Sequence, residues 1–289
     1  MIGAVLVVVV SLVPLFFGGP VFTFFMVVLG VAGYREYLQL VSRVNPGGIA
    51  SLAWVGYGVV VAWGCAALIG ETTYSLFLLA VFSVVAPLLL LLLTPMQQGG
   101  FSGWCFASTG SLYLGLPIYA SIATRSLSGT INADWLSGAA HRLSLGWDPG
   151  PRGLAWALTV ILATWVGDSA ALFAGMALGK RKLAPMISPN KSQEGAIAGL
   201  LASIVVGAVS FQGFGLGTWT LGLIAGVVIG LSGQIGDLAE SALKRQAGVK
   251  DSGSLVPGHG GILDRIDALL FAFPAGFLMA VGLERIGPW

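Results

Sequence analysis

Long runs of apolar residues, separated by short polar segments, are the feature that most limits how this chain can fold. Charged residues make up only 9% of the 289 residues, and 56% are hydrophobic. A soluble domain carries about 25% charged residues, so this chain has too few charges to cover a surface in water. The sequence therefore predicts an all-α, polytopic integral membrane protein.

A helix needs about 20 mostly apolar residues to cross the hydrocarbon core of a bilayer. About nine segments meet this rule: 1–17, 21–40, 49–70, 74–94, 102–123, 153–179, 195–212, 216–236 and 264–283. Gly18-Gly19-Pro20 is a turn signal between the first two, and no basic region precedes it, so we expect a membrane helix rather than a cleaved signal peptide. The segment 216–236 should continue as a helix to Arg245, which places Asp237, Glu240 and Lys244 on one face.

Basic residues predict the orientation. The connections 35–48, 180–194 and 244–263 carry most of them, and with nine spans these connections share one side, which should be cytoplasmic. The N-terminus is then inside, in the inner (cytoplasmic) membrane, and the C-terminus is outside. The connection 124–152 falls outside, where Arg125, Arg142 and Arg152 are a mild counter-signal.

Charge also divides the chain into two regions. Seven of the 12 acidic and eight of the 14 basic residues lie between positions 160 and 270. We therefore expect transmembrane scaffold helices in residues 1–150 and a catalytic region in 151–289, with a polar cavity facing the cytoplasm. The net charge of +2 is too small to indicate a nucleic-acid partner, and Cys65 and Cys105 fit no metal spacing.

The segment 241–267 mixes cations, carboxylates, glycines and a histidine between two apolar segments. Charge near a membrane core is costly, so its presence indicates function. Asp264 and Asp267 are three residues apart and would repel one another unless a cation lies between or beside them. With Asp237 from another helix they suit Mg²⁺, and the remaining acids leave room for a second cation. The alternative is that Asp264 caps its helix while Asp267 pairs with Arg265 or Lys244.

Cations and glycines accompany these acids. Lys244, Arg245 and Lys250 suit a phosphate clamp, although a purely topological role explains such clusters equally well. The glycines around His259 favour the clamp, because they indicate backbone that bends or closely approaches a ligand. A simple loop hydrogen bond is the alternative role for the histidine.

A second group of polar residues lies upstream. Asp168 stands in an apolar run and needs a partner. Ser188, Lys191, Ser192 and Glu194 combine hydroxyl groups with a cation near a helix start, which predicts a triphosphate site. An ordinary cytoplasmic loop, with Ser188 or Ser192 as a helix cap, is the alternative.

Together these residues resemble the phosphatidate cytidylyltransferase, or CDP-diacylglycerol synthase, family. The resemblance covers residues 160–270 well, and Glu36 lies near an early acidic position of the family. Leu172 and Met176 depart from the family pattern, which usually has Tyr and a basic residue there. The fixed positions of the family's C-terminal signature are all present: Ser241, Lys244-Arg245, Lys250-Asp251, Pro257-Gly258-His259-Gly260-Gly261, Asp264-Arg265 and Asp267.

The resemblance implies that CTP and phosphatidate react to give CDP-diacylglycerol and pyrophosphate, with magnesium held by Asp237, Asp264 and Asp267. It also implies a homodimer. Lys244 would act in catalysis. The substrate-binding set would be Asp168, Ser188, Lys191, Ser192, Arg245, Lys250, Asp251, His259, Gly260, Gly261 and Arg265.

Two rival functions use the same residues differently. Carboxylates within the membrane also mark the ion paths of transporters, but no inverted repeat is visible and the charges gather at helix ends. Another lipid-headgroup enzyme, such as one that acts on an isoprenoid lipid, would need a different acceptor.

Overall fold

Helices dominate the structure, as the sequence predicts. The computed structural model describes residues 2–45, 52–69, 72–93, 100–143, 150–255 and 260–286. The helices are α1 (Ile2–Phe17), α2 (Gly19–Val44), α3 (Ala53–Ile69), α4 (Thr72–Leu93), α5 (Gly100–Arg125), α6 (Asp134–Leu143), α7 (Pro151–Leu178), α8 (Gln193–Phe214), α9 (Trp219–Gln246), α10 (Leu263–Ile266) and α11 (Leu269–Ile286). The strands are β1 (Lys182–Ala184) and β2 (Ser188–Ser192).

The helices have the length and composition of membrane spans. In the described part of the chain, six stretches are long and apolar enough to cross a bilayer: 19–44, 74–93, 151–178, 193–214, 219–246 and 263–285. Ile197, Leu201, Val205 and Val209 follow one another every four residues along α8, and all are exposed. An outward apolar stripe of this kind suits contact with lipid, so the chain is a multi-pass membrane protein, while the number nine stays a prediction.

The chain forms two compact units, each of which combines segments that are distant in sequence. The first holds Met1–Val8, Pro20–Ala123 and Leu243–Ile266. The second holds Val9–Gly19, Thr124–Ala242 and Asp267–Trp289. The segment with most of the family signature therefore folds with the N-terminal helices. The predicted functional division near residue 150 stays a prediction.

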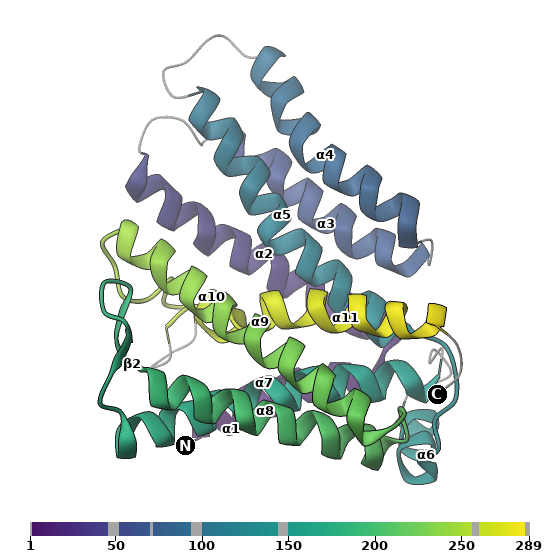
Figure 1. Ribbon diagram of the computed structural model, residues 1–289. Helices are drawn as coiled ribbons and strands as arrows, with labels where there is room; N and C mark the ends of the chain where they lie inside the picture. Colours follow the sequence, from purple (N-terminus) through teal and green to yellow (C-terminus); the bar gives the residue numbers. More distant parts are fainter. Residues whose placement is uncertain are drawn as a thin grey trace. The chain divides into compact units, whose positions relative to one another are not determined.

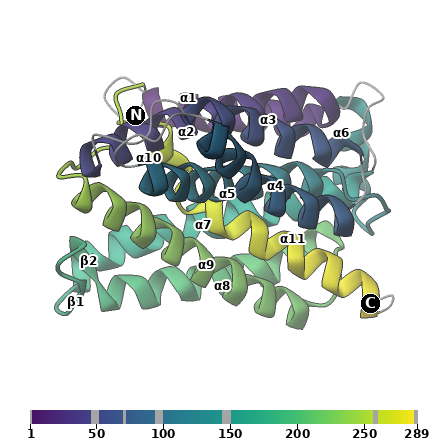
Figure 2. The same ribbon diagram turned by 90° about the horizontal axis from the view of Figure 1, so that it is seen from above.

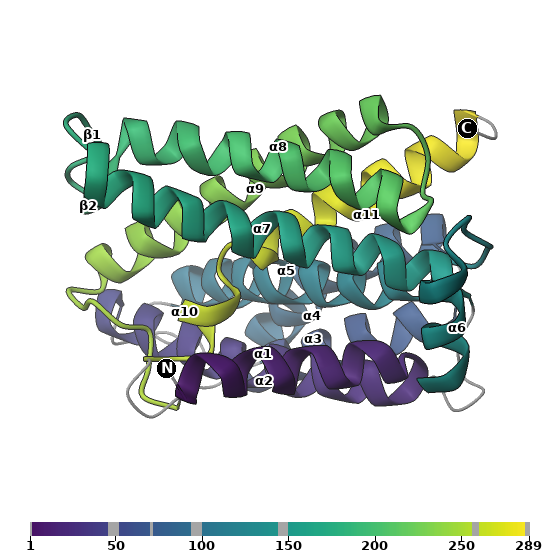
Figure 3. The ribbon, with the colours of Figure 1, turned by 90° about the horizontal axis from the view of Figure 1, so that it is seen from below.

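The second unit is organised around α7, which packs along α8 (Figures 1 and 3). The N-terminal half of α7 is almost entirely buried. Ser203 of α8 donates a hydrogen bond to the carbonyl of Ala163 on α7, at 2.8 Å. A Cβ at Gly226 of α9 would lie 2.5 Å from Ser203 O. Small residues therefore allow these backbones to approach closely, as is common between membrane helices.

A short antiparallel hairpin of β1 and β2 joins α7 to α8 (Figure 3). The sequence predicts only a loop here. The Glu194 carboxylate accepts hydrogen bonds from the backbone N–H of Lys180, at 3.1 Å, and of Arg181, at 3.2 Å. These bonds tie the start of α8 to the end of α7 and so hold the base of the hairpin.

The first unit contains α2, α3, α4 and most of α5 (Figure 2). Aromatic side chains make many of the contacts among these helices. Tyr34 and Tyr37 stack on α2, with ring centroids 6.0 Å apart. The Tyr37 hydroxyl donates to the carbonyl of Phe106 on α5, at 3.0 Å. Trp63 of α3 meets Tyr119 of α5 edge to face, at 5.8 Å. This packing fixes α2 against its neighbours.

Two of the three basic residues that oppose the predicted orientation have structural partners within the second unit. Arg125 is fully buried, and its Nε donates to the carbonyl of Leu15 at the end of α1, at 2.7 Å. Arg152 pairs with Glu284, at 3.6 Å. Their charges therefore serve contacts inside the protein, which weakens the counter-signal. The predicted connection 124–152 also contains α6, a helix that the sequence analysis does not predict.

Candidate functional site

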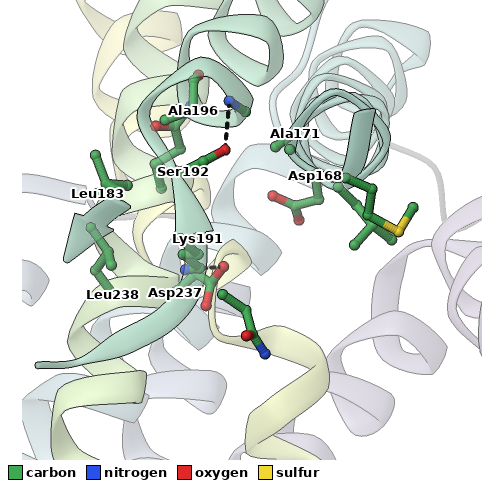
Figure 4. Close-up of a pocket in the computed structure, with 14 residues that line it drawn as sticks. Asp168, Ala171, Leu183, Lys191, Ser192, Ala196, Asp237 and Leu238 are labelled. Carbon is green, nitrogen blue, oxygen red and sulfur yellow. Dashed lines mark hydrogen bonds and ion pairs between the residues drawn. The ribbon is translucent and has the colours of Figure 1, made fainter. Parts of the chain in front are cut away.

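A cavity of about 530 Å³ opens in the second unit, between α7, the hairpin, α8 and α9. Asp168 enters it from α7, Lys191 and Ser192 from β2, and Asp237 from α9 (Figure 4). The sequence predicts each of these four residues as part of a site. Three elements far apart in the chain thus bring two carboxylates, a cation and a hydroxyl to one space.

Charge within this cavity is not balanced. Lys191 forms an ion pair with Asp237, and both side chains keep about a third of their surface exposed, 28% and 32%. The Asp168 carboxylate interacts electrostatically with Asp237 and Lys191. Two carboxylates therefore share one cation. Because the ion pair is accessible, an incoming ligand can reach all three groups.

The local structure explains why β2 delivers these groups. Ser192 is the N-cap of α8, and its hydroxyl accepts a hydrogen bond from Gly195 N at 3.1 Å. This is the capping role that the sequence analysis names as an alternative for Ser192, and the residue lines the cavity as well. Ser188 pairs with Ala184 at the other end of β2 and is not among the residues that line the cavity.

One wall of the cavity is apolar. Leu172 and Met176 lie four and eight residues after Asp168 on α7, and both line the cavity while remaining largely exposed. These are the positions at which the sequence departs from the family pattern. In the structure they extend the polar site into an apolar surface along a helix that can span a membrane.

A second polar cluster lies in the first unit and centres on Asp264. Lys244 Nζ donates to Asp264 Oδ1, at 2.6 Å, and both side chains are buried, with 12% and 6% exposed. Asp264 Oδ2 accepts from Ser252 N at 2.9 Å, Ser252 Oγ at 2.8 Å and Gly261 N at 2.8 Å. Lys244 thus pairs with Asp264, and Asp264 accepts loop N–H groups instead of only capping its own helix.

Glycine is required beside this carboxylate. Gly260 has φ +80°, and a Cβ there would lie 2.8 Å from Asp264 Oδ2. The two glycines after His259 thus let the backbone turn closely around an acid. His259 itself lies outside the described residues.

The remaining predicted residues of this segment lie at its surface. Lys250, Asp251 and Arg265 are exposed. Arg245 is exposed too, and it donates to the carbonyl of Val249, at 3.2 Å. These residues are accessible to a ligand, and their role in binding phosphate stays a prediction.

Asp267 falls at the break between α10 and α11 and belongs to the second unit. Its Oδ1 accepts from Ala268 N, at 2.8 Å. A Cβ at Gly236 would lie 2.5 Å from the Asp267 carbonyl oxygen, so the backbones approach closely one residue before Asp237. The structure thus brings Asp237 and Asp267 to adjoining turns of neighbouring elements.

The donor set of the cavity fits a hard divalent cation on chemical grounds. Asp168 and Asp237 offer carboxylate oxygens in one space, and Mg²⁺ is commonly bound through one or two carboxylates together with water and substrate phosphate. No group of three His, Cys, Asp or Glu side chains with metal-binding geometry occurs among the residues that the structure describes. A joint ligand set of Asp237, Asp264 and Asp267 stays a prediction.

Two further polar residues lie at these sites without a strong signal in the sequence. Gln234 lines the cavity, and its Nε2 donates to the carbonyl of Ala196, at 2.9 Å. Glu36 is buried in the first unit beside Ser252. A glutamate within an apolar helix is itself a signal of function, whereas nothing in the sequence pattern marks the glutamine.

The Cytidylyltransferase family profile matches residues 1–282. The phosphatidate cytidylyltransferase of Staphylococcus saprophyticus subsp. saprophyticus is 46% identical over 125 residues, which is 43% of this chain and 48% of the relative. The protein of that name from Staphylococcus haemolyticus is 48% identical over 124 residues, with 42% and 47% covered. The chain thus matches about half the length of these curated relatives.

Proposed function

Because the chain belongs to the cytidylyltransferase family, we propose that it converts CTP and phosphatidate into CDP-diacylglycerol and pyrophosphate. The cavity in the second unit carries this proposal, since Asp168, Lys191 and Asp237 meet there beside an apolar wall. The names of the relatives support the same substrates.

The two halves of the cavity suit the two halves of the lipid substrate. Phosphatidate keeps its acyl chains in the leaflet while its phosphate must meet a soluble nucleotide. Leu172 and Met176 offer apolar contact along α7, and Lys191 offers a point charge for phosphate. The ion pair with Asp237 holds Lys191 at the cavity until a substrate phosphate replaces the Asp237 carboxylate as its partner.

The reaction needs positioning more than proton transfer. An anionic oxygen of the phosphatidate headgroup attacks the α-phosphorus of CTP, and the bond from that phosphorus to the bridging oxygen breaks, so that pyrophosphate leaves. A phosphate monoester has a second pKa of about 6, so the nucleophile is already deprotonated at neutral pH. Catalysis then depends on alignment and on neutralising charge.

A divalent cation, which we take to be Mg²⁺, belongs to this proposal. When bound, it would neutralise phosphate charge and stabilise the leaving pyrophosphate. Asp168 and Asp237 are the carboxylates that would hold it in the second unit, and the charge on Lys191 complements theirs. Asp267, in the same unit, remains a candidate for this ion, and Asp264 remains a candidate for a second cation.

The site is proposed to face the cytoplasm from the inner membrane. Lys180, Arg181 and Lys182 are exposed at the start of the hairpin that lines the cavity, and cytoplasmic segments of membrane proteins are rich in such residues. CTP reaches the site from that side. The homodimer implied by the family resemblance belongs to this proposal as well.

Transfer of radiolabel from α-labelled CTP into a chloroform-soluble product tests the proposal. The purified protein is supplied with Mg²⁺ and, in parallel, with phosphatidate, an isoprenoid phosphate or no acceptor. We expect labelled lipid only with phosphatidate. Labelling with the isoprenoid alone would move the protein to another lipid-headgroup reaction, and no labelled lipid with any acceptor would refute the enzyme proposal.

A further inference from the structure

Glu36 is a charged residue with no place in the chemistry above, although it lies in α2, one of the membrane-spanning stretches. Only 1% of its surface is exposed. A buried carboxylate is costly in an apolar segment, where an apolar residue of similar size would be cheaper. Its presence there calls for a role beyond filling the core.

The contacts of Glu36 all lead to the segment 252–263, more than 200 residues away in sequence. Its Oε1 accepts from Ile262 N, at 3.0 Å. Its Oε2 accepts from Leu263 N at 2.8 Å and lies 3.1 Å from Ser252 Oγ, whose single hydroxyl proton faces both Glu36 and Asp264. One carboxylate therefore holds both ends of this segment.

The segment is shaped to receive the carboxylate. A Cβ at Gly253 would lie 2.5 Å from Glu36 Oε1, and a Cβ at Gly261 would overlap Glu36 Oε2 and Ser252 Oγ. Two glycines thus provide the space that the glutamate occupies. Such close approach of backbone to a carboxylate is one of the functions that glycine serves best.

Ser252 connects Glu36 with the second polar cluster. Its hydroxyl lies 3.1 Å from Glu36 Oε2 and 2.8 Å from Asp264 Oδ2, and its backbone N–H donates to the same Asp264 oxygen. Asp264 in turn holds Lys244. If Glu36 moved, Ser252 would therefore move with it, and the positions of Asp264 and Lys244 would change.

We infer that Glu36 is a positioning residue, which fixes Ser252 together with Ile262 and Leu263 and through them sets Asp264 and Lys244 for the transferase reaction. The inference rests on the proposed function, in which Asp264 is a candidate ligand for a cation, and Lys244 is bound to Asp264. Glu36 touches neither substrate in this account. It acts entirely through the backbone N–H groups and the serine hydroxyl that it binds.

The variants Glu36→Gln and Glu36→Asp test this role. The glutamine side chain of the first variant offers one acceptor oxygen where two are used, so we expect kcat to fall about 100-fold, the effect of roughly 1 Å of misplacement. The aspartate keeps both oxygens on a shorter side chain and should restore part of the loss. We expect the KM for phosphatidate to stay unchanged. A smaller fraction of folded protein would also lower the measured kcat at constant KM, so a second measurement is needed.

Hydrogen–deuterium exchange supplies that measurement. In Glu36→Gln, peptides covering 252–263 should exchange at least 10-fold faster, while peptides from α7 and α8 keep the wild-type rate. Glu284→Gln, which removes a half-exposed carboxylate paired with Arg152, is the matched control and should change neither kcat nor exchange. If Glu36→Gln fails to fold, Glu36→Asp carries both measurements.

A double variant separates positioning from simple stabilisation. Because Glu36 acts partly through Ser252, and Ser252 also binds Asp264 directly, the combined loss of kcat in Glu36→Gln with Ser252→Ala should be smaller than the product of the two single losses. Wild-type kcat in Glu36→Gln, unchanged loop exchange, or equal loss of protection in α7 and α8 would each overturn the inference. A wild-type protein without CTP-dependent activity would refute the proposed function instead, and the exchange experiment would still report whether Glu36 holds the loop.

Discussion

Two clusters of acids, one in each unit, show how differently the same side chain can be used. Asp168 and Asp237 border an accessible cavity and share one partly exposed lysine. Glu36 is buried and Asp264 is partly buried, and both accept hydrogen bonds from donors of the chain. Carboxylates that the protein leaves accessible can bind a ligand directly, whereas carboxylates that accept several of its own N–H groups also hold the chain in place, whatever part they take in the reaction.

The strongest test of this contrast is Asp237→Asn. We expect kcat for CDP-diacylglycerol formation to fall about 100- to 1000-fold, as for other groups that stabilise charge in a transition state. Stability should change by about 1 kcal/mol or less, because the ion pair with Lys191 is partly exposed. Labelled-CTP turnover and thermal unfolding of the purified protein measure the two quantities, and wild-type turnover would remove Asp237 from the site.

In contrast to Asp237→Asn, Asp264→Asn should first of all lower the stability of the protein. The change leaves the buried Lys244 cation without its counter-charge, which costs about 3–5 kcal/mol. Chemical unfolding of the purified protein measures the loss. The double variant with Lys244→Met should recover part of it, because the uncompensated charge is gone. Equal stability in Asp264→Asn and Asp237→Asn would contradict the distinction between the clusters.

Gly261→Ala examines how tightly the saturated cluster is packed. Its Cβ would overlap Ser252 Oγ and the Glu36 carboxylate, so we expect a loss of about 1–3 kcal/mol, typical of overpacking. Gly138→Ala in α6 is the control, because a Cβ there meets nothing within 4 Å. Equal unfolding midpoints for the two variants would argue against close packing around Glu36.

Ser192→Ala should have the smallest effect, about 1 kcal/mol, which is the usual contribution of a helix N-cap. Ser169→Ala is the control, since the exposed Ser169 hydroxyl only donates to the carbonyl of Trp165 one turn earlier. Thermal unfolding distinguishes the two. Loss of CTP affinity in Ser192→Ala with unchanged stability would show that the hydroxyl serves the ligand rather than α8.

The sequence predicts the helices well because their signal is local. Apolar length alone locates α7, α8 and α9 to within a few residues, and the glycine turn after Phe17 ends α1 as expected. The extension of α9 past the apolar stretch to Gln246 follows from its helical spacing of charges. Each of these features depends on neighbours within one or two helical turns.

The site is less predictable because it depends on partners that are distant in sequence. Asp168, Lys191 and Asp237 could be named as candidates, but their meeting in one cavity depends on how α7 and α9 pack around the hairpin. The hairpin itself carries too few strand-forming residues to be recognised. Glu36 lies 216 residues from Ser252, so only the fold reveals what it binds.

The buried Arg125 has a consequence for biosynthesis. The carbonyl of Leu15, near the C-terminal end of α1, accepts its hydrogen bond from Arg125, which is synthesised 110 residues later. At translation rates of about 5–20 residues per second, roughly 6 to 22 s separate the two on the ribosome. The last turn of α1 therefore lacks this donor until α5 has been synthesised.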